Sequence, residues 1–179
     1  MKKLVLVLLG LTLGNLSAQQ IQWMTLGEAL EAQKKEPKKI VMDVYTDWCG
    51  PCKLYDRNTF QNPDVVRYIS EFYYAVKFNA EGTELIQFFD KTFSNPNHDP
   101  NRRGRNATHQ FTQFLGVRGY PTIVFLSENG DPIMPVVGYK TPQQLELFLK
   151  MIKQGDYQIF KTSEDFQNYQ KNFIPKFRG

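Results

Sequence analysis

Both cysteines of this 179-residue chain lie in the stretch 47–53, which reads D-W-C-G-P-C-K. Two thiols with two residues between them can close a disulfide around a very short loop. In the chain-entropy model, a loop of about four residues contributes only about 2 kcal/mol to stability, against roughly 3 kcal/mol for fifteen residues. Because this spacing suits a stabilising cross-link poorly, we interpret Cys49 and Cys52 as a redox couple.

The residues around the pair indicate how it would react. The apolar segment 40–45 predicts a strand buried on both faces, and a helix is expected to begin at the motif and run to about Asn58. The unpaired N–H groups and dipole at a helix N-terminus favour a thiolate, so the pKa of Cys49 should fall. Pro51 has no N–H group and fits the first turn. We expect Cys49 to attack a substrate disulfide and the less exposed Cys52 to resolve the mixed disulfide.

Two other uses of the thiols were weighed. Structural zinc requires four ligands, and the chain offers only His98 and His109 beside the cysteines, at a spacing that is unusual for zinc. An inert disulfide is the other alternative. We therefore expect no metal, and no visible motif predicts a flavin or nicotinamide cofactor.

The pattern of polar and apolar residues predicts an α/β fold. Its central mixed β-sheet would carry helices on both faces, because two strand–helix units precede a β-hairpin and a further helix. We expect strands over 40–45, 73–79, 122–126 and 133–137, and helices over 25–35, from 49 to about 58, from 62, over 83–93 and 108–115, from 141, and over 163–172.

The first eighteen residues are typical of a secretory signal peptide. Lys2 and Lys3 precede an apolar run, and small and polar residues follow up to Ala18. The run is about ten residues long, too short for a membrane span of roughly twenty, although an uncleaved anchor is the alternative. Residues 19–179 would then form one domain in the periplasm or outside the cell, without a stable membrane span. Removal of Lys2 and Lys3 with the signal peptide lowers the formal net charge from +4 to +2, which does not argue for nucleic acid.

The segment 40–53, I-V-M-D-V-Y-T-D-W-C-G-P-C-K, resembles the active-site strand and helix start of thioredoxin. The resemblance covers about residues 38–153 and implies the thioredoxin fold. It also implies that Asp43 exchanges a proton with Cys52 and that Lys77 lies close to that carboxylate. The strand pattern independently places Asp43 in the interior, where desolvation should raise its pKa. An edge-strand aspartate facing water is the alternative.

A further match is Pro121 in R-G-Y-P-T. The resemblance implies that the peptide bond before Pro121 is cis, that the proline faces the cysteines, and that the backbone of Tyr120 pairs with the substrate chain. It also implies a flat substrate-binding surface around Cys49, shaped by Trp48, Gly50, Pro51, Gly119 and Gly138.

The chain departs from plain thioredoxin in three places. Residues 82–110 form an insertion before the strand that Pro121 opens, and residues 154–179 add a helical extension. The insertion carries Arg102, Arg103 and Arg105. It would either select an acidic partner or be a solvated variable loop. Asp47 would oppose a thiolate at Cys49, and Lys53 would offset its charge.

These observations predict an exported thiol–disulfide oxidoreductase that reduces protein disulfides. Since the chain shows no motif for an electron-carrying cofactor, a membrane thiol protein would supply the electrons. The alternatives are a disulfide oxidase or isomerase, and a protein-binding module that only retains the fold.

Overall fold

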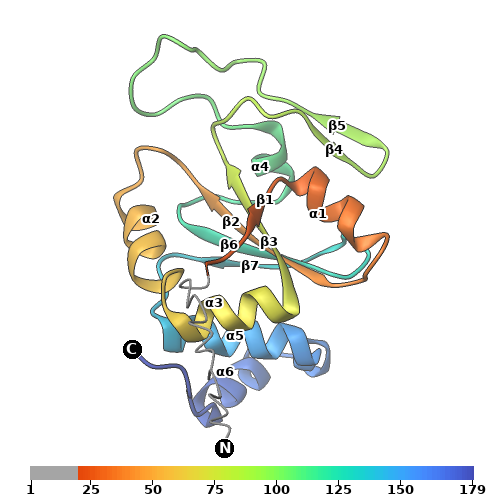
Figure 1. The fold of residues 1–179 in the computed structure, drawn as a ribbon, viewed down its shortest axis with the longest axis vertical. Coiled ribbons are helices and arrows are strands. Elements are labelled where there is room, and N and C mark those ends of the chain that lie inside the picture. Colours follow the sequence, from red (N-terminus) through yellow and green to blue (C-terminus); the bar gives the residue numbers. More distant parts are fainter. Residues whose placement is uncertain (1–19) are drawn as a thin grey trace, which may run out of the picture.

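The computed structural model describes residues 20–179, so the predicted signal peptide and its cleavage site lie outside the described residues. Five strands form one mixed sheet in the order β1–β3–β2–β6–β7 (Figure 1). This confirms the predicted central mixed sheet. The strands are β1 (Trp23–Met24), β2 (Lys39–Tyr45), β3 (Tyr73–Asn79), β6 (Thr122–Leu126) and β7 (Pro132–Val137).

The central strand, β2, carries the residues that lead into the cysteine motif. It runs parallel to β3 and antiparallel to β6, and the register sets Asp43 opposite Lys77 on one side and Ile123 on the other. Every residue of β2 except Tyr45 is buried, which confirms a strand covered on both faces. Strand β1 was not predicted, because its two residues are too few to show a periodic pattern.

Helices cover both faces of the sheet, as expected. On one face α3 and α5 pack over Val41 and Phe125, and on the other α1 and α4 pack over Ile40 and Met42. Side chains alternate between faces along a strand, so Asp43 shares the face of Val41. The helices are α1 (Leu26–Gln33), α2 (Gly50–Leu54), α3 (Pro63–Phe72), α4 (Gln110–Phe114), α5 (Pro142–Gln154) and α6 (Ser163–Asn172).

The helix predicted over 83–93 is wrong. This stretch forms the hairpin of β4 (Ile86–Phe88) and β5 (Lys91–Phe93), in a second, two-stranded sheet. Ile86 and Phe88 point into the core while the residue between them is exposed, a period of two that belongs to a strand. Phe89, at a φ of 53°, turns the chain back toward β5.

Two further helices differ from the prediction in type or length. The helix that begins at the cysteine motif ends close to the predicted position, but it leaves regular α geometry after Leu54 and continues as a π-helical turn, Tyr55–Thr59. Tyr55 in this turn is buried in the core. The helix predicted over 108–115 is shorter, since His109 caps it by accepting a hydrogen bond from the Phe111 N–H at 3.0 Å.

The C-terminal extension is anchored to the helices of one face. Glu146 on α5 is fully buried and accepts hydrogen bonds from the backbone N–H groups of Lys176 and Phe177, both at 2.7 Å. Arg178 pairs with Asp64 on α3 at 3.1 Å. The extension therefore lies beside α3 and α5, at the opposite end of the molecule from the β4–β5 hairpin (Figure 1).

Candidate active site

Cys49 and Cys52 form a disulfide, with their Cα atoms 5.3 Å apart. Cys49 is the N-cap of α2, and its sulfur accepts a hydrogen bond from the Cys52 N–H at 3.2 Å. Cys49 is 2% exposed and Cys52 is 3% exposed, so the expectation that Cys52 would be the less exposed is wrong for this oxidised state. The bond holds the Cys49 sulfur inside the first turn, against the backbone.

Asp43 is 1% exposed on β2, which confirms its predicted burial. Its Oδ2 lies 3.4 Å from the Nζ of Lys77, and among the described residues neither carboxylate oxygen has a hydrogen-bond partner. Desolvation raises the pKa of Asp43 to about 7, against a lowering by the charge of Lys77. At neutral pH this carboxyl can both accept and release a proton.

Lys77 is held by a second carboxylate that sequence reasoning missed. Its ammonium contacts Asp56, and it also lies 5.3 Å from the ring centroid of Trp23 and 5.0 Å from that of Tyr45. Asp56 follows Cys52 by four residues, so helical spacing was the available signal that it shares the face of Cys52. Since Lys77 divides its charge between two acids, it stabilises the Asp43 carboxylate less than an exclusive pair would.

Replacing Asp56 with asparagine should lower the pKa of Asp43 below about 7. The negative charge of Asp56 contributes to raising that pKa, and its removal also leaves Lys77 free to pair with Asp43 alone. An NMR titration of the Asp43 carboxyl carbon in the oxidised protein measures the shift. An unchanged or higher pKa in Asp56→Asn would show that Lys77 does not couple the two acids.

Tyr55 and Thr46 add buried polar groups near the disulfide that sequence reasoning did not single out. Among the described residues, neither side-chain oxygen has a hydrogen-bond partner. Burial, reinforced by the charge of Asp43, raises the pKa of Tyr55 well above its usual value. The phenol therefore stays neutral in the site.

The peptide bond between Tyr120 and Pro121 is cis, as the resemblance implied. The Pro121 carbonyl accepts a hydrogen bond from Gly138 N–H at 2.8 Å, and Gly138 has a φ of 84°, which disfavours residues with a side chain. Thr122 donates its hydroxyl to the Gly119 carbonyl at 2.8 Å. The two glycines thus fix the backbone on either side of the proline.

Trp48 lies beside Tyr120, with ring centroids 6.0 Å apart in an edge-to-face arrangement. Its indole Nε1 donates to the carboxylate Oε2 of Glu81 at 2.8 Å, and the same oxygen accepts the backbone N–H of Asn106 at 2.8 Å. Glu81, which is 8% exposed, was not predicted as a site residue. One buried carboxylate therefore joins the cysteine motif to the insertion.

The remaining predicted positions lie at the surface of the motif. Gly50 and Pro51 are exposed in the first turn of α2. Asp47 accepts a hydrogen bond from Asn79 at 3.1 Å, and no ion pair joins it to Lys53 within the described chain. The expected offset of Asp47 by Lys53 has no direct contact to support it.

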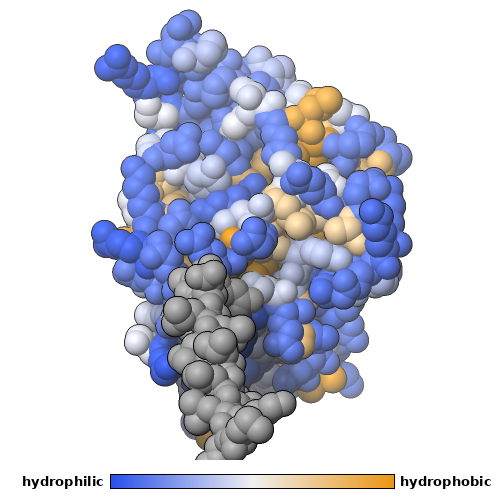
Figure 2. Space-filling view, in the orientation of Figure 1, coloured by the Kyte–Doolittle hydropathy of each residue, from blue (hydrophilic) through white to orange (hydrophobic). Residues whose placement is uncertain are grey.

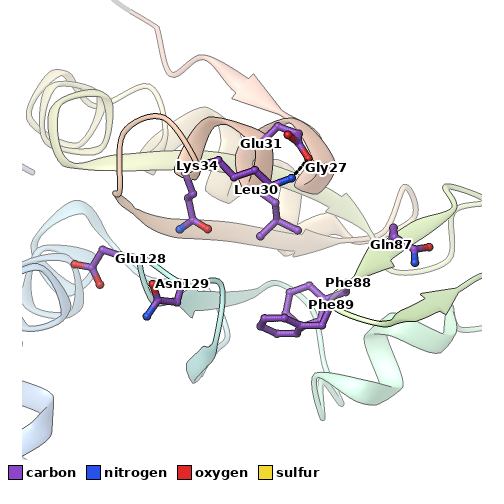
Figure 3. Close-up of a pocket in the computed structure, with 10 residues that line it drawn as sticks. Gly27, Leu30, Glu31, Lys34, Gln87, Phe88, Phe89, Glu128 and Asn129 are labelled. Carbon is purple, nitrogen blue, oxygen red and sulfur yellow. Dashed lines mark hydrogen bonds and ion pairs between the residues drawn. The ribbon is translucent and has the colours of Figure 1, made fainter.

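One cavity borders the site, and another lies apart from it. One of about 590 Å³ is lined by Asp56 and Lys77 together with Trp23 and Phe60, so solvent reaches the lysine that contacts Asp43. Another of about 650 Å³ lies between α1, the β4–β5 hairpin and the turn after β6, and none of the predicted site residues lines it (Figure 3). Over residues 20–179, no group of three or more acidic, histidine or cysteine side chains is placed to hold a metal ion.

The fold and site combine a disulfide at the start of a helix, a buried carboxyl on the strand that leads into it, and a cis-proline directly before β6. A family model described as a thioredoxin-like domain matches residues 26–153. The chain belongs to this thioredoxin-like family.

Similarity to individual proteins agrees with this assignment. The thiol:disulfide interchange protein DsbD of Pectobacterium atrosepticum is 31% identical over 121 residues, which are 66% of this chain but 17% of that protein. DsbD of Klebsiella pneumoniae is 32% identical over 106 residues, 59% of this chain and 14% of the relative. The chain thus spans under a fifth of the length of these relatives.

Solved structures show the same fold at low identity. A thioredoxin-fold protein from Helicobacter pylori superposes with a TM-score of 0.58 at 23% identity, covering 75% of this chain and 81% of the other. A thioredoxin from Thermus thermophilus gives a TM-score of 0.55 at 14% identity, covering 74% and 87%.

Proposed function

We propose that this chain is an exported thiol–disulfide oxidoreductase that reduces protein disulfides through the Cys49–Cys52 couple. One observation carries the proposal: a disulfide at the start of a helix lies next to a strand whose buried Asp43 has a pKa raised to about 7. A structural cross-link needs no such group, whereas a resolving thiol must lose its proton in a shielded site.

The reaction begins with the reduced protein. The Cys49 thiolate attacks one sulfur of a substrate disulfide, forms a mixed disulfide and releases the first substrate thiolate. Cys52 then transfers its proton to Asp43 and attacks the Cys49 sulfur, which releases the second substrate thiolate and leaves the disulfide. Two electrons pass to the substrate. Trp48, Gly50, Pro51, Tyr120 and Pro121 would form the surface on which the substrate chain lies.

The next turnover requires an external electron donor. Relatives that match this chain are named thiol:disulfide interchange proteins, although the match covers only a small part of their length. We propose a membrane thiol protein as the donor, and a periplasmic or secreted location that depends on cleavage of residues 1–18. Within residues 20–179, no helix combines the length and apolar character needed to cross a bilayer.

The proposal also specifies the direction of electron flow, from the Cys49–Cys52 couple to the substrate. If the couple has a reduction potential near −270 mV, as thioredoxin has, it favours reduction of substrates, whereas a value near −120 mV, as in a strong oxidant, would favour disulfide donation. Equilibration of the protein with a series of dithiothreitol redox buffers, followed by alkylation of free thiols, measures this potential.

Reduction of insulin by dithiothreitol tests the activity itself. We expect the mature protein to accelerate precipitation of the insulin B chain, and the matched variant Cys49→Ser, with one thiol fewer, to lack this effect. If the wild-type protein gave no acceleration, the enzyme proposal would fail in favour of a protein-binding module.

A further inference from the structure

Hydrogen bonds hold residues 95–107 of the insertion in a defined conformation. The Asn95 side-chain amide, in a residue only 8% exposed, donates to the backbone carbonyls of Gly82 at 3.1 Å and Ala107 at 2.8 Å. Asn106 and Asp99 bond to each other twice, at 2.9 and 2.8 Å. These hydrogen bonds therefore join the two ends of the segment 95–107, and they also join Asp99 to Asn106 within it. These hydrogen bonds order the segment, although residues 96, 97 and 99–105 are exposed to solvent.

This structure is fixed to the cysteine motif. The Glu81 carboxylate binds both Trp48 and the backbone of Asn106, so the residue that precedes Asn106 has a defined position over the indole. That residue is Arg105, and its guanidinium carbon lies 4.5 Å from the ring centroid of Trp48. Stacking on the indole orients the guanidinium and reduces the rotamer freedom that a substrate contact would otherwise remove.

The positive charge of the insertion remains available to a partner. Arg102, Arg103 and Arg105 are exposed, and they form no ion pair with any other residue in the described part of the chain. The end of the molecule that carries the insertion is largely hydrophilic on the face that Figure 2 shows. Among the three arginines of this described segment, Arg105 is the one that stacks on the ring of Trp48, next to Cys49.

We propose that Arg105 is a specificity-determining residue, which favours disulfide substrates carrying a carboxylate next to the attacked cysteine. This inference rests on the proposed reductase function and names the substrate class of the same site. A guanidinium fork binds a carboxylate through two parallel hydrogen bonds. The Trp48 ring contacts both Arg105 and the ring of Tyr120, whose backbone is proposed to pair with the substrate chain. A side chain that flanks the substrate cysteine would therefore lie near the fork.

The test uses three synthetic cyclic peptides, each closed by one disulfide, with glutamate, glutamine or lysine on both sides of the attacked cysteine. The mature protein is reduced with dithiothreitol, desalted, and mixed with one peptide in a single turnover, and the reduced peptide is quantified by mass spectrometry. We expect the glutamate peptide to react about threefold to fivefold faster than the glutamine peptide at low salt, the upper range for an exposed ion pair. High salt should reduce this preference.

Variants assign the preference to one side chain. Arg105→Gln should remove it, and Arg105→Glu should make the lysine peptide the faster substrate. Arg103→Gln is the matched control, since it removes one positive charge from the same insertion away from the indole, and it should keep most of the preference. Circular dichroism verifies that each variant folds.

The outcomes separate the two proposals. If wild-type protein reduces glutamate and glutamine peptides at equal rates, the Arg105 inference is overturned and the reductase function stands. If Arg103→Gln loses the preference as fully as Arg105→Gln, the general charge of the insertion acts and the assignment to Arg105 is wrong. If no peptide is reduced, the reductase function fails and the inference fails with it.

Discussion

Substitution of Cys49 with serine is expected to abolish disulfide reduction, because this residue supplies the attacking thiolate. Substitution of Cys52 with serine should instead trap substrates as stable mixed disulfides, since the attack still occurs and the resolving thiol is missing. The reduced Cys52→Ser protein, mixed with an oxidised peptide, should gain the peptide mass in non-reducing mass spectrometry. Turnover should fall in both variants to the rate without protein.

Peptide mapping identifies which sulfur carries the substrate. We expect the adduct at Cys49 in Cys52→Ser and little adduct in Cys49→Ser, where the remaining thiol lies inside the first turn of α2. The mapping is needed because both cysteines are similarly buried in the oxidised state, so exposure alone does not distinguish their roles. A stable adduct at Cys52 in Cys49→Ser would reverse the assignment of the two roles.

Replacing Asp43 with asparagine should slow resolution of the mixed disulfide roughly a hundredfold at neutral pH, the lower range for loss of a general base. Initial attack by Cys49 should change less, because that thiolate is stabilised by the helix start. Rapid-mixing kinetics with acid quenching separate the two steps. If resolution is unchanged from pH 6 to 8, Asp43 does not accept the proton of Cys52.

The same substitution should change how stability depends on pH. Burial raises the pKa of Asp43 from 3.8 to about 7, so folding favours the protonated form. This contribution is fully present below the unfolded pKa of about 4 and is lost as the pH rises through 7. The difference between these two pKa values corresponds to a loss of folding free energy on the order of 4 kcal/mol.

Asp43→Asn removes this loss, so its stability relative to wild type should grow between about pH 4 and 7 and then level off. Urea denaturation of the oxidised proteins measures it, since neither cysteine titrates while the disulfide is intact. A stability difference that stays constant across this range would mean that Asp43 does not titrate with a raised pKa in the folded protein.

Local signals in the sequence were strong enough to predict most of the elements near the site. The capping boxes at Thr25 and Thr141 begin helices where expected, and the apolar run of β2 is buried as predicted. The failure at 83–93 has a local cause as well. An aromatic-rich stretch with few turn residues fits a helix or a hairpin, and pairing of Ile86 with Phe93 across the turn decided between them.

The residues of the candidate site also divide into those that the sequence predicted and those that it did not. Cys49, Cys52, Asp43 and Pro121 could be predicted because each follows from spacing or strand pattern, or from the resemblance to thioredoxin. Asp56 was missed although its spacing from Cys52 was an available signal. Glu81 could not be predicted, since nothing in its neighbouring residues distinguishes it from a solvated acid.

The sequence by itself determined the redox pair, the strand that leads into it and the buried acid six residues before Cys49, because these depend on residues close together in the chain. Only the tertiary structure decided which distant groups meet. Parallel pairing of β2 and β3 brings Lys77 between Asp43 and Asp56, and a carboxylate at the end of β3 binds both Trp48 and the insertion. Such contacts join residues up to dozens of positions apart, so they depend on strand order and loop closure, which local sequence patterns do not encode.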